Sequence, residues 1–116
     1  YTLDPTDGDH LCIWDANVTG MSETAQAAWT DTDNTGFGYS LDNIVGSGAQ
    51  FTYGANFDAR HFADAQAGHD PVTLFNTEGV PTNNHSVHVC YRIVPDALTA
   101  AGNYYNYITY TATATF

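Results

Sequence analysis

The sequence predicts an all-β fold: a single antiparallel β-sandwich of the Ig-like or Greek-key kind, with about seven strands and one candidate short helix. The chain ends in a run with a side-chain period of two, Gly102–Phe116, which is the period of a pleated strand. A second alternating run, Ser86–Val94, precedes it. The other apolar segments are short and separated by turn-forming residues, a pattern typical of sandwiches. At this length we expect one domain, residues 1–116.

The earlier elements are short. Leu11–Trp14 is an apolar strand. Ser22–Trp29 contains Ala, Gln and Glu, which favour a helix, but its β surroundings favour a strand or irregular structure. Asn56–Ala67 has residues at helical spacing among alanines and is the candidate helix. The other expected strands are Gly38–Leu41, Gln50–Tyr53 and Val72–Phe75.

The last two strands carry the clearest patterns, and we expect them to pair antiparallel through a loop of about seven residues. In Ser86–Val94, one face carries Val87, Val89, Tyr91 and Ile93, and the other carries His88, Cys90, Arg92 and Val94. In the closing run, the predicted core face carries Tyr104, Asn106, Ile108, Tyr110, Ala112, Ala114 and Phe116, and the outer face carries Tyr105, Tyr107 and alternate threonines.

The charge balance excludes several partners. Thirteen acidic residues face two arginines, Arg60 and Arg92, and the net charge is −11. Nucleic acids and anionic membrane surfaces would repel such a chain, and no apolar run approaches the roughly 20 residues of a membrane span. We interpret the acidity as a solubility device of a secreted protein; a saline habitat or a divalent-cation site is the alternative.

Two cysteines, Cys12 and Cys90, lie far apart in the sequence. They are either two buried free thiols or one disulfide that ties an early strand to a late one. The composition is that of an exported protein, so we predict the disulfide.

The segment after Thr30 resembles a calcium loop in its spacing. Oxygen-bearing side chains stand at Asp31, Asp33 and Thr35 (positions one, three and five counted from Asp31), with Asn34 between them, and Asp42 stands at twelve. Alternating oxygens at such positions converge on one hard cation. Calcium is therefore the one candidate cofactor, and an ordinary polar turn is the alternative.

No motif indicates an enzyme. Ser47 lacks a nucleophile elbow, the few glutamates form no acid–base pair, and His85 and His88 would point to opposite faces of a strand. Two glycosylation sequons, at Asn17 and Asn84, matter only in a host that modifies exported proteins.

The chain is rich in aromatic residues, eight of them tyrosines. Exposed tyrosine is typical of contact surfaces, which makes Tyr105 and Tyr107 the predicted interface; a solvated Tyr/Thr sheet face is the alternative. The predicted core aromatics are Trp14, Trp29, Phe51, Phe57, Phe62 and Phe75.

The segments Tyr91–Pro95, Ala101–Tyr104 and Ile108–Phe116 resemble the closing hairpin of exported bacterial β-sandwich domains. The pattern is similar to spore coat U-type secreted pilins and to WxL-type cell-surface domains. The resemblance implies an extracellular or cell-surface location without enzymatic activity. The chain departs from these families in two ways: its N-terminus is too short and polar for a pilin donor strand, and it has no Trp-x-Leu signature.

We therefore predict an extracellular structural protein, a subunit of a pilus, fibre or cell-surface layer. It would self-associate into a homopolymer through sheet edges or aromatic faces. The alternative is a calcium-dependent adhesin or glycan-binding module, with a glycan or a host surface as its ligand.

Overall fold

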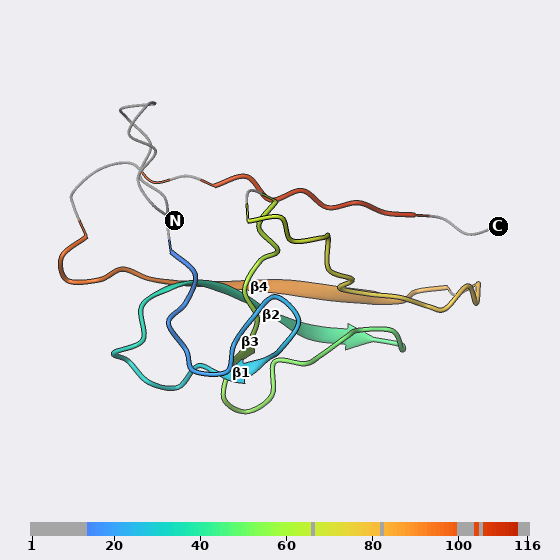
Figure 1. The fold of residues 1–116 in the computed structure, drawn as a ribbon. Coiled ribbons are helices and arrows are strands. Elements are labelled where there is room, and N and C mark those ends of the chain that lie inside the picture. The colour runs from blue at the N-terminus through green and yellow to red at the C-terminus, as the bar shows by residue number, and fades with distance from the viewer. Residues whose placement is uncertain (1–13, 66, 82, 100–103, 105, 114–116) are drawn as a thin grey trace.

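The computed structural model describes residues 14–65, 67–81, 83–99, 104 and 106–113, and these residues form an all-β structure without a helix. The four strands are β1 (Ala27–Ala28), β2 (Gly36–Val45), β3 (Asp58–Ala59) and β4 (Ser86–Val94). They form two small antiparallel sheets, β1–β3 and β2–β4 (Figure 1). The all-β prediction is confirmed, whereas the described residues contain fewer strands than the predicted sandwich. None of them forms a helix that could cross a membrane.

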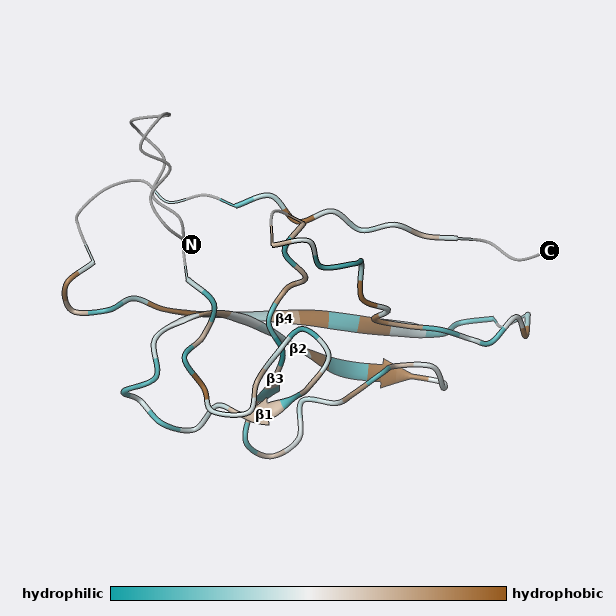
Figure 2. Ribbon diagram, in the orientation of Figure 1, coloured by the Kyte–Doolittle hydropathy of each residue, from teal (hydrophilic) through white to brown (hydrophobic). Residues whose placement is uncertain are grey.

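The β2–β4 pair is the main sheet. Tyr39 lies opposite Tyr91 and Leu41 opposite Val89, and the register shifts between Asp42 and Val45. Because the paired residues keep their alternation, the faces predicted for Ser86–Val94 are confirmed. Figure 2 shows the alternating hydropathy along β4.

Strand β2 lies at the centre of this sheet because its second edge is also occupied. The Phe37 amide donates to the Trp14 carbonyl at 2.8 Å, and Tyr39 exchanges two backbone hydrogen bonds with Arg60 at 2.9 and 3.0 Å. The residues from Gly36 to Leu41 are all buried. A Cβ at Gly36 would lie 2.6 Å from the Asp15 carbonyl oxygen, so a glycine lets the N-terminal segment cross the start of β2.

Two apolar clusters cover the two faces of the β2–β4 sheet. One gathers around Trp29, Phe57 and Met21, and Cys90 and Val94 of β4 pack against it. The other is built on Tyr39, Leu41 and Phe51, with Val87 and Val89 of β4 packed against it. Trp29, Phe51 and Phe57 are buried as predicted, and Phe62 and Phe75 are half-buried. Trp14 was expected in the core, but it lies at the start of the described chain with 60% of its surface exposed.

The candidate helix at Asn56–Ala67 is wrong. Phe57 has a φ of 50°, a left-handed conformation that a helix does not contain. The Asp58 amide donates to the Tyr53 carbonyl at 2.7 Å, which closes a turn that leads into β3. Ala59 of β3 then pairs with Ala27 of β1, so the strand interpretation of Ser22–Trp29 is confirmed for Ala27–Ala28.

The closing run also differs from its prediction. Strand β4 pairs with β2 rather than with this run, and residues 106–113 belong to no strand. Tyr39 and Leu41 of β2 bring buried side chains opposite β4, whereas the end of the run carries alanine and threonine, which bury less apolar area. The rest of the predicted strand, residues 102–103, 105 and 114–116, lies outside the described residues.

Candidate functional site

An aromatic cluster on one face of the β2–β4 sheet is the candidate interaction surface; it comprises Phe37, Tyr39, Phe51, Phe62 and Tyr91. The ring centroid of Phe62 lies 5.0 Å from that of Phe37, 4.5 Å from that of Tyr39 and 5.9 Å from that of Tyr91. Tyr39 is almost fully buried, but Tyr91 is 48% exposed and its neighbour Ile93 is 54% exposed. The cluster thus extends from the buried core to the exposed surface of the sheet.

The exposed end of this cluster lies where the N-terminal segment meets the sheet. Phe37 pairs with Ile93 on one edge of β2 and bonds the Trp14 backbone on the other. Ile93 and Trp14 are both exposed large apolar residues. Ile93 and Trp14 thus lie on the two chain segments that flank Phe37, and exposed apolar patches are typical of interaction sites.

The closing run reaches this cluster through a pair of tyrosines. The hydroxyls of Tyr91 and Tyr110 share a hydrogen bond. Tyr110 is 53% exposed, but its partial burial raises its pKa above the ordinary value, and the hydrogen bond to Tyr91 adds to the shift. Burial also raises the pKa of Tyr39. A tyrosine hydroxyl is already neutral at physiological pH, and the upward shifts keep it so. Tyr110 and Tyr39 thus offer apolar rings with hydrogen-bonding hydroxyls, which are typical of contact surfaces.

The predicted interface residues are only partly described. Tyr107 has 87% of its surface exposed, and Tyr105 lies outside the described residues. Sequence reasoning missed Tyr91, Ile93 and Trp14 as surface residues. Their apolar alternation is the same as that of core residues, and the sequence carries no signal that this end of the sheet is left uncovered.

The structure does not bring the predicted calcium ligands together. The Asp33 amide donates to the Asp31 carboxylate at 2.9 Å, so these residues form a local turn. Asp42 lies on β2 opposite His88, and seven residues of extended chain place it roughly 20 Å from Thr35. Among the described residues, no group of three or more His, Cys, Asp or Glu side chains could hold a metal ion.

Cys90 lies half-buried in β4, opposite Ser40, and packs against the Trp29 cluster. It forms no disulfide with any residue that the structure describes. Its predicted partner, Cys12, lies outside this part of the chain, so the Cys12–Cys90 disulfide stays a prediction. Of the two sequon asparagines, Asn17 accepts a hydrogen bond from the Thr35 amide at 2.8 Å and Asn84 is exposed.

A carboxylate–imidazole pair ties the N-terminal segment to the chain after β3. His61 donates from Nε2 to the Ala16 carbonyl at 2.8 Å, and its Nδ1 lies 4.0 Å from the Asp15 carboxylate. Burial raises the pKa of Asp15, and His61 opposes that shift. Because His61 holds the backbone through Nε2, the pair serves as a structural contact.

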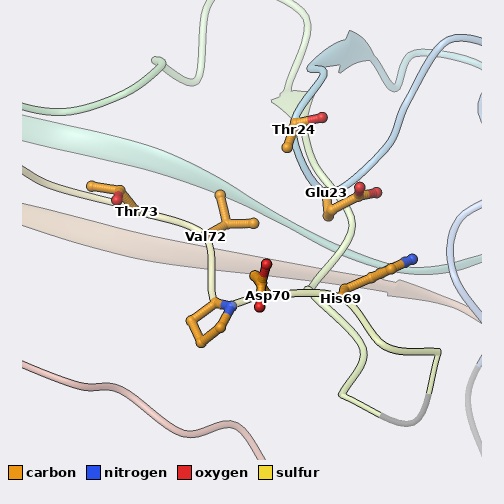
Figure 3. A pocket seen from close by; sticks show the side chains of 7 residues that line it. Glu23, Thr24, His69, Asp70, Val72 and Thr73 are labelled. Atoms are coloured by element: carbon orange, nitrogen blue, oxygen red, sulfur yellow. The ribbon is translucent and has the colours of Figure 1, made fainter.

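A hollow of about 420 Å³ lies between two loops. Figure 3 shows Glu23 and Thr24 on one loop, with His69, Asp70 and the segment up to Thr73 on the other. The His69 ring accepts a hydrogen bond from the Asp64 amide at 3.3 Å, which occupies its Nδ1. The two carboxylates and the imidazole that line the hollow lie at exposed or half-buried loop positions. Water would compete there with a polar ligand.

Comparison with known proteins adds no relative: no protein-family model, no curated protein and no solved structure matches the chain.

Proposed function

We propose that the chain is an extracellular structural subunit that self-associates into a pilus, fibre or cell-surface layer. The observation that carries the proposal is the aromatic cluster that runs from the buried Tyr39 to the half-exposed Tyr91 and Ile93. A second protein surface placed on it would remove apolar area from water, and each 100 Å² is worth roughly 2.5 kcal/mol before the costs of association.

The fold supports this proposal. The β2–β4 sheet is one layer of the proposed sandwich, and the closing run lies over it through the Tyr91–Tyr110 contact. A contact that joins two different surfaces of a subunit repeats without closing and gives a filament. The low number of cations and the predicted Cys12–Cys90 disulfide fit an oxidising, extracellular location.

The test is the oligomeric state of the purified chain. Sedimentation velocity over a concentration series, with electron microscopy of the concentrated samples, should show oligomers and then filaments. Replacing the two predicted contact residues (Tyr105→Ala with Tyr107→Ala) should weaken association. Leu98→Ala is the control, since Leu98 is 92% exposed, compared with 87% for Tyr107, but lies in the turn after β4. Monomers at every concentration, salt level and calcium level would refute the proposal.

A further inference from the structure

Two tyrosine hydroxyls join the closing run to the aromatic cluster. Tyr91 of β4 and Tyr110 of the closing run share a hydrogen bond between their phenol oxygens. Figure 1 shows residues 106–113 (red) extended alongside β4 (orange). In a phenol, each ortho carbon lies only two bonds from the hydroxyl oxygen. The contact therefore also brings the ortho carbons of the two rings close together.

Other contacts hold the two rings in this position. The Tyr91 ring centroid lies 5.9 Å from that of Phe62 and 6.2 Å from that of Phe37. Tyr104, six residues before Tyr110, stands in a β-bridge, so the backbone of the closing run is attached near its start. Because both rings belong to one chain and are held in contact, a reaction between them has a high effective concentration.

Both phenol rings are open to a reagent in solution. Tyr91 is 48% exposed and Tyr110 is 53% exposed, whereas Tyr39 of the same cluster is almost fully buried. Sulfur atoms oxidise readily, but in the described part of the chain Cys90 and Met21 pack on the opposite face of the sheet. An oxidant on this face therefore meets the tyrosine pair without a competing thiol or thioether among the described residues.

We infer that Tyr91 and Tyr110 form an oxidative cross-linking site, at which a one-electron oxidant joins the two rings as dityrosine. A peroxidase that turns over hydrogen peroxide is an oxidant of this class. The reaction takes place within one chain, so it goes beyond the proposed self-association and does not depend on it.

The reaction balances with hydrogen peroxide as the electron acceptor. Each phenol gives one electron and its hydroxyl proton to the oxidant, and the unpaired electron that remains is shared with the ortho carbons. A carbon–carbon bond forms between an ortho carbon of Tyr91 and one of Tyr110. The hydrogen on each of these carbons then moves to the phenol oxygen as a proton. Two hydrogen atoms leave the protein, and one hydrogen peroxide is reduced to two waters.

The hydrogen bond already has the arrangement of the product. Coupling through the ortho carbons leaves the two hydroxyls on neighbouring positions across the new bond, where they can hydrogen-bond to each other. The bond would tie the closing run to the β2–β4 sheet. Like a disulfide, it would constrain the unfolded chain and so stabilise the folded one.

The positions of the two arginines make the product easy to identify. Trypsin cuts after lysine and arginine, and the chain has no lysine and only Arg60 and Arg92. A complete digest therefore gives three peptides: 1–60, 61–92 and 93–116.

The experiment oxidises dilute, monomeric protein with a peroxidase and hydrogen peroxide. The product is unfolded, its disulfides are reduced, and it is digested with trypsin and analysed by mass spectrometry. Tyr91 is the only tyrosine of peptide 61–92, and Tyr110 lies in peptide 93–116. We expect these two peptides to be joined with the loss of two hydrogen atoms, and the product to have dityrosine fluorescence. Fragmentation of the joined peptides should place the bond at Tyr110.

Phenylalanine variants test the pair, because they keep the ring and remove the hydroxyl. Tyr110→Phe should lower the yield of joined peptides roughly tenfold or more, since the positioned partner is lost. Tyr107→Phe is the matched control, because Tyr107 lies in the same peptide and is 87% exposed. If exposure alone selected the partner of Tyr91, Tyr107→Phe would lower the yield more than Tyr110→Phe. Far-UV circular dichroism verifies that each variant is folded.

Thermal melts give a second readout. Oxidised protein should melt at a higher temperature than untreated protein, because the cross-link constrains its unfolded chain. The Tyr110→Phe variant should not gain stability from the same treatment.

Four results would overturn the inference. Peptide 61–92 could be recovered unjoined after oxidation, or Tyr110→Phe could leave the yield unchanged. Tyr107→Phe could lower the yield as much as Tyr110→Phe does. Oxidation could also give cross-linked dimers without the bond inside one chain. The oligomeric state of untreated protein tests the proposed function separately from all four.

Discussion

The two arginines show how single residues stabilise this fold. Arg92 lies 3.8 Å from the ring centroid of Phe57 and 5.4 Å from that of Trp29, and it donates a hydrogen bond to the Trp29 carbonyl. Arg60 lies 4.5 Å from the Phe51 ring centroid, and its buried Nε has no hydrogen-bond partner in the described part of the chain. Both arginines therefore pack against aromatic clusters. They differ in that Arg92 donates a hydrogen bond, whereas the Nε of Arg60 has no partner in the described part of the chain.

Replacing Arg92 by methionine should destabilise the protein by about 1–3 kcal/mol, because a cation–π contact and a charged hydrogen bond are lost together. Methionine keeps the apolar stem, so packing changes little. Urea unfolding followed by tryptophan fluorescence measures the change in the free energy of unfolding. Arg60→Met is the matched control and should cost less, since the Arg60 Nε already lacks a partner. An equal or larger loss for Arg60→Met would contradict this assignment.

At the scale of elements, Gly36 decides whether the N-terminal segment can bond to β2. Its φ is 120°, and a Cβ would lie 2.6 Å from the Asp15 carbonyl oxygen and 2.7 Å from the Ala16 Cα. Both neighbours are backbone atoms, which cannot move aside as a flexible side chain can. The hydrogen bonds between Phe37 and residues 14 and 16 depend on this close approach.

Gly36→Ala should therefore destabilise the fold by more than the roughly 1–2 kcal/mol of a positive φ alone. Gly20→Ala separates the two effects, because Gly20 has a φ of 83° with nothing within 4 Å of its Cβ position. Thermal melts of both variants test the difference. Similar melting temperatures would show that the N-terminal segment can move away from Gly36 without a loss of stability. Its contact with β2 would then contribute little to the free energy of unfolding.

The sequence predicted β4 well and its partner poorly, for a physical reason. Alternation reports which face of a strand is buried, and Val87 and Val89 lie on the predicted face. It does not report which strand lies alongside. From Gly36 to Leu41, strand β2 is buried on both faces, and Gly36 and Gly38 interrupt its pattern, so the sequence predicts only its short apolar part. Phe57 lies in a helix-like pattern, but long-range pairing of Ala59 with Ala27 outweighs that weak local preference.

The candidate site was harder to predict than the fold. Tyr91 and Ile93 have the apolar character of core residues, and their exposure depends on what covers the far end of the sheet. Spacing alone suggested a calcium loop, but extended β2 carries Asp42 away from Asp31. The spacing of residues along a sequence does not predict which of them the folded chain brings together.

For the whole molecule, the charge distribution should control assembly. Only two arginines stand against thirteen acidic residues, so copies of net charge −11 repel each other. The aromatic cluster and the predicted contact residues Tyr105 and Tyr107 carry no carboxylate. Salt should therefore screen repulsion between distant parts of two copies and leave the contact itself unchanged.

Association should accordingly strengthen as ionic strength rises, on the order of tenfold between low salt and 0.5 M, where the Debye length is only about 4 Å. Sedimentation equilibrium at several sodium chloride concentrations measures this slope. Asp31→Asn with Asp33→Asn removes two charges from a loop outside the proposed contact, so it should increase association at low salt and flatten the slope. The control pair Thr30→Asn with Thr32→Asn alters the same exposed loop without changing its charge and should leave the slope unchanged. Association that weakens with salt would instead require ion pairs across the interface, which aromatic and aliphatic side chains cannot form, and it would exclude the proposed aromatic contact.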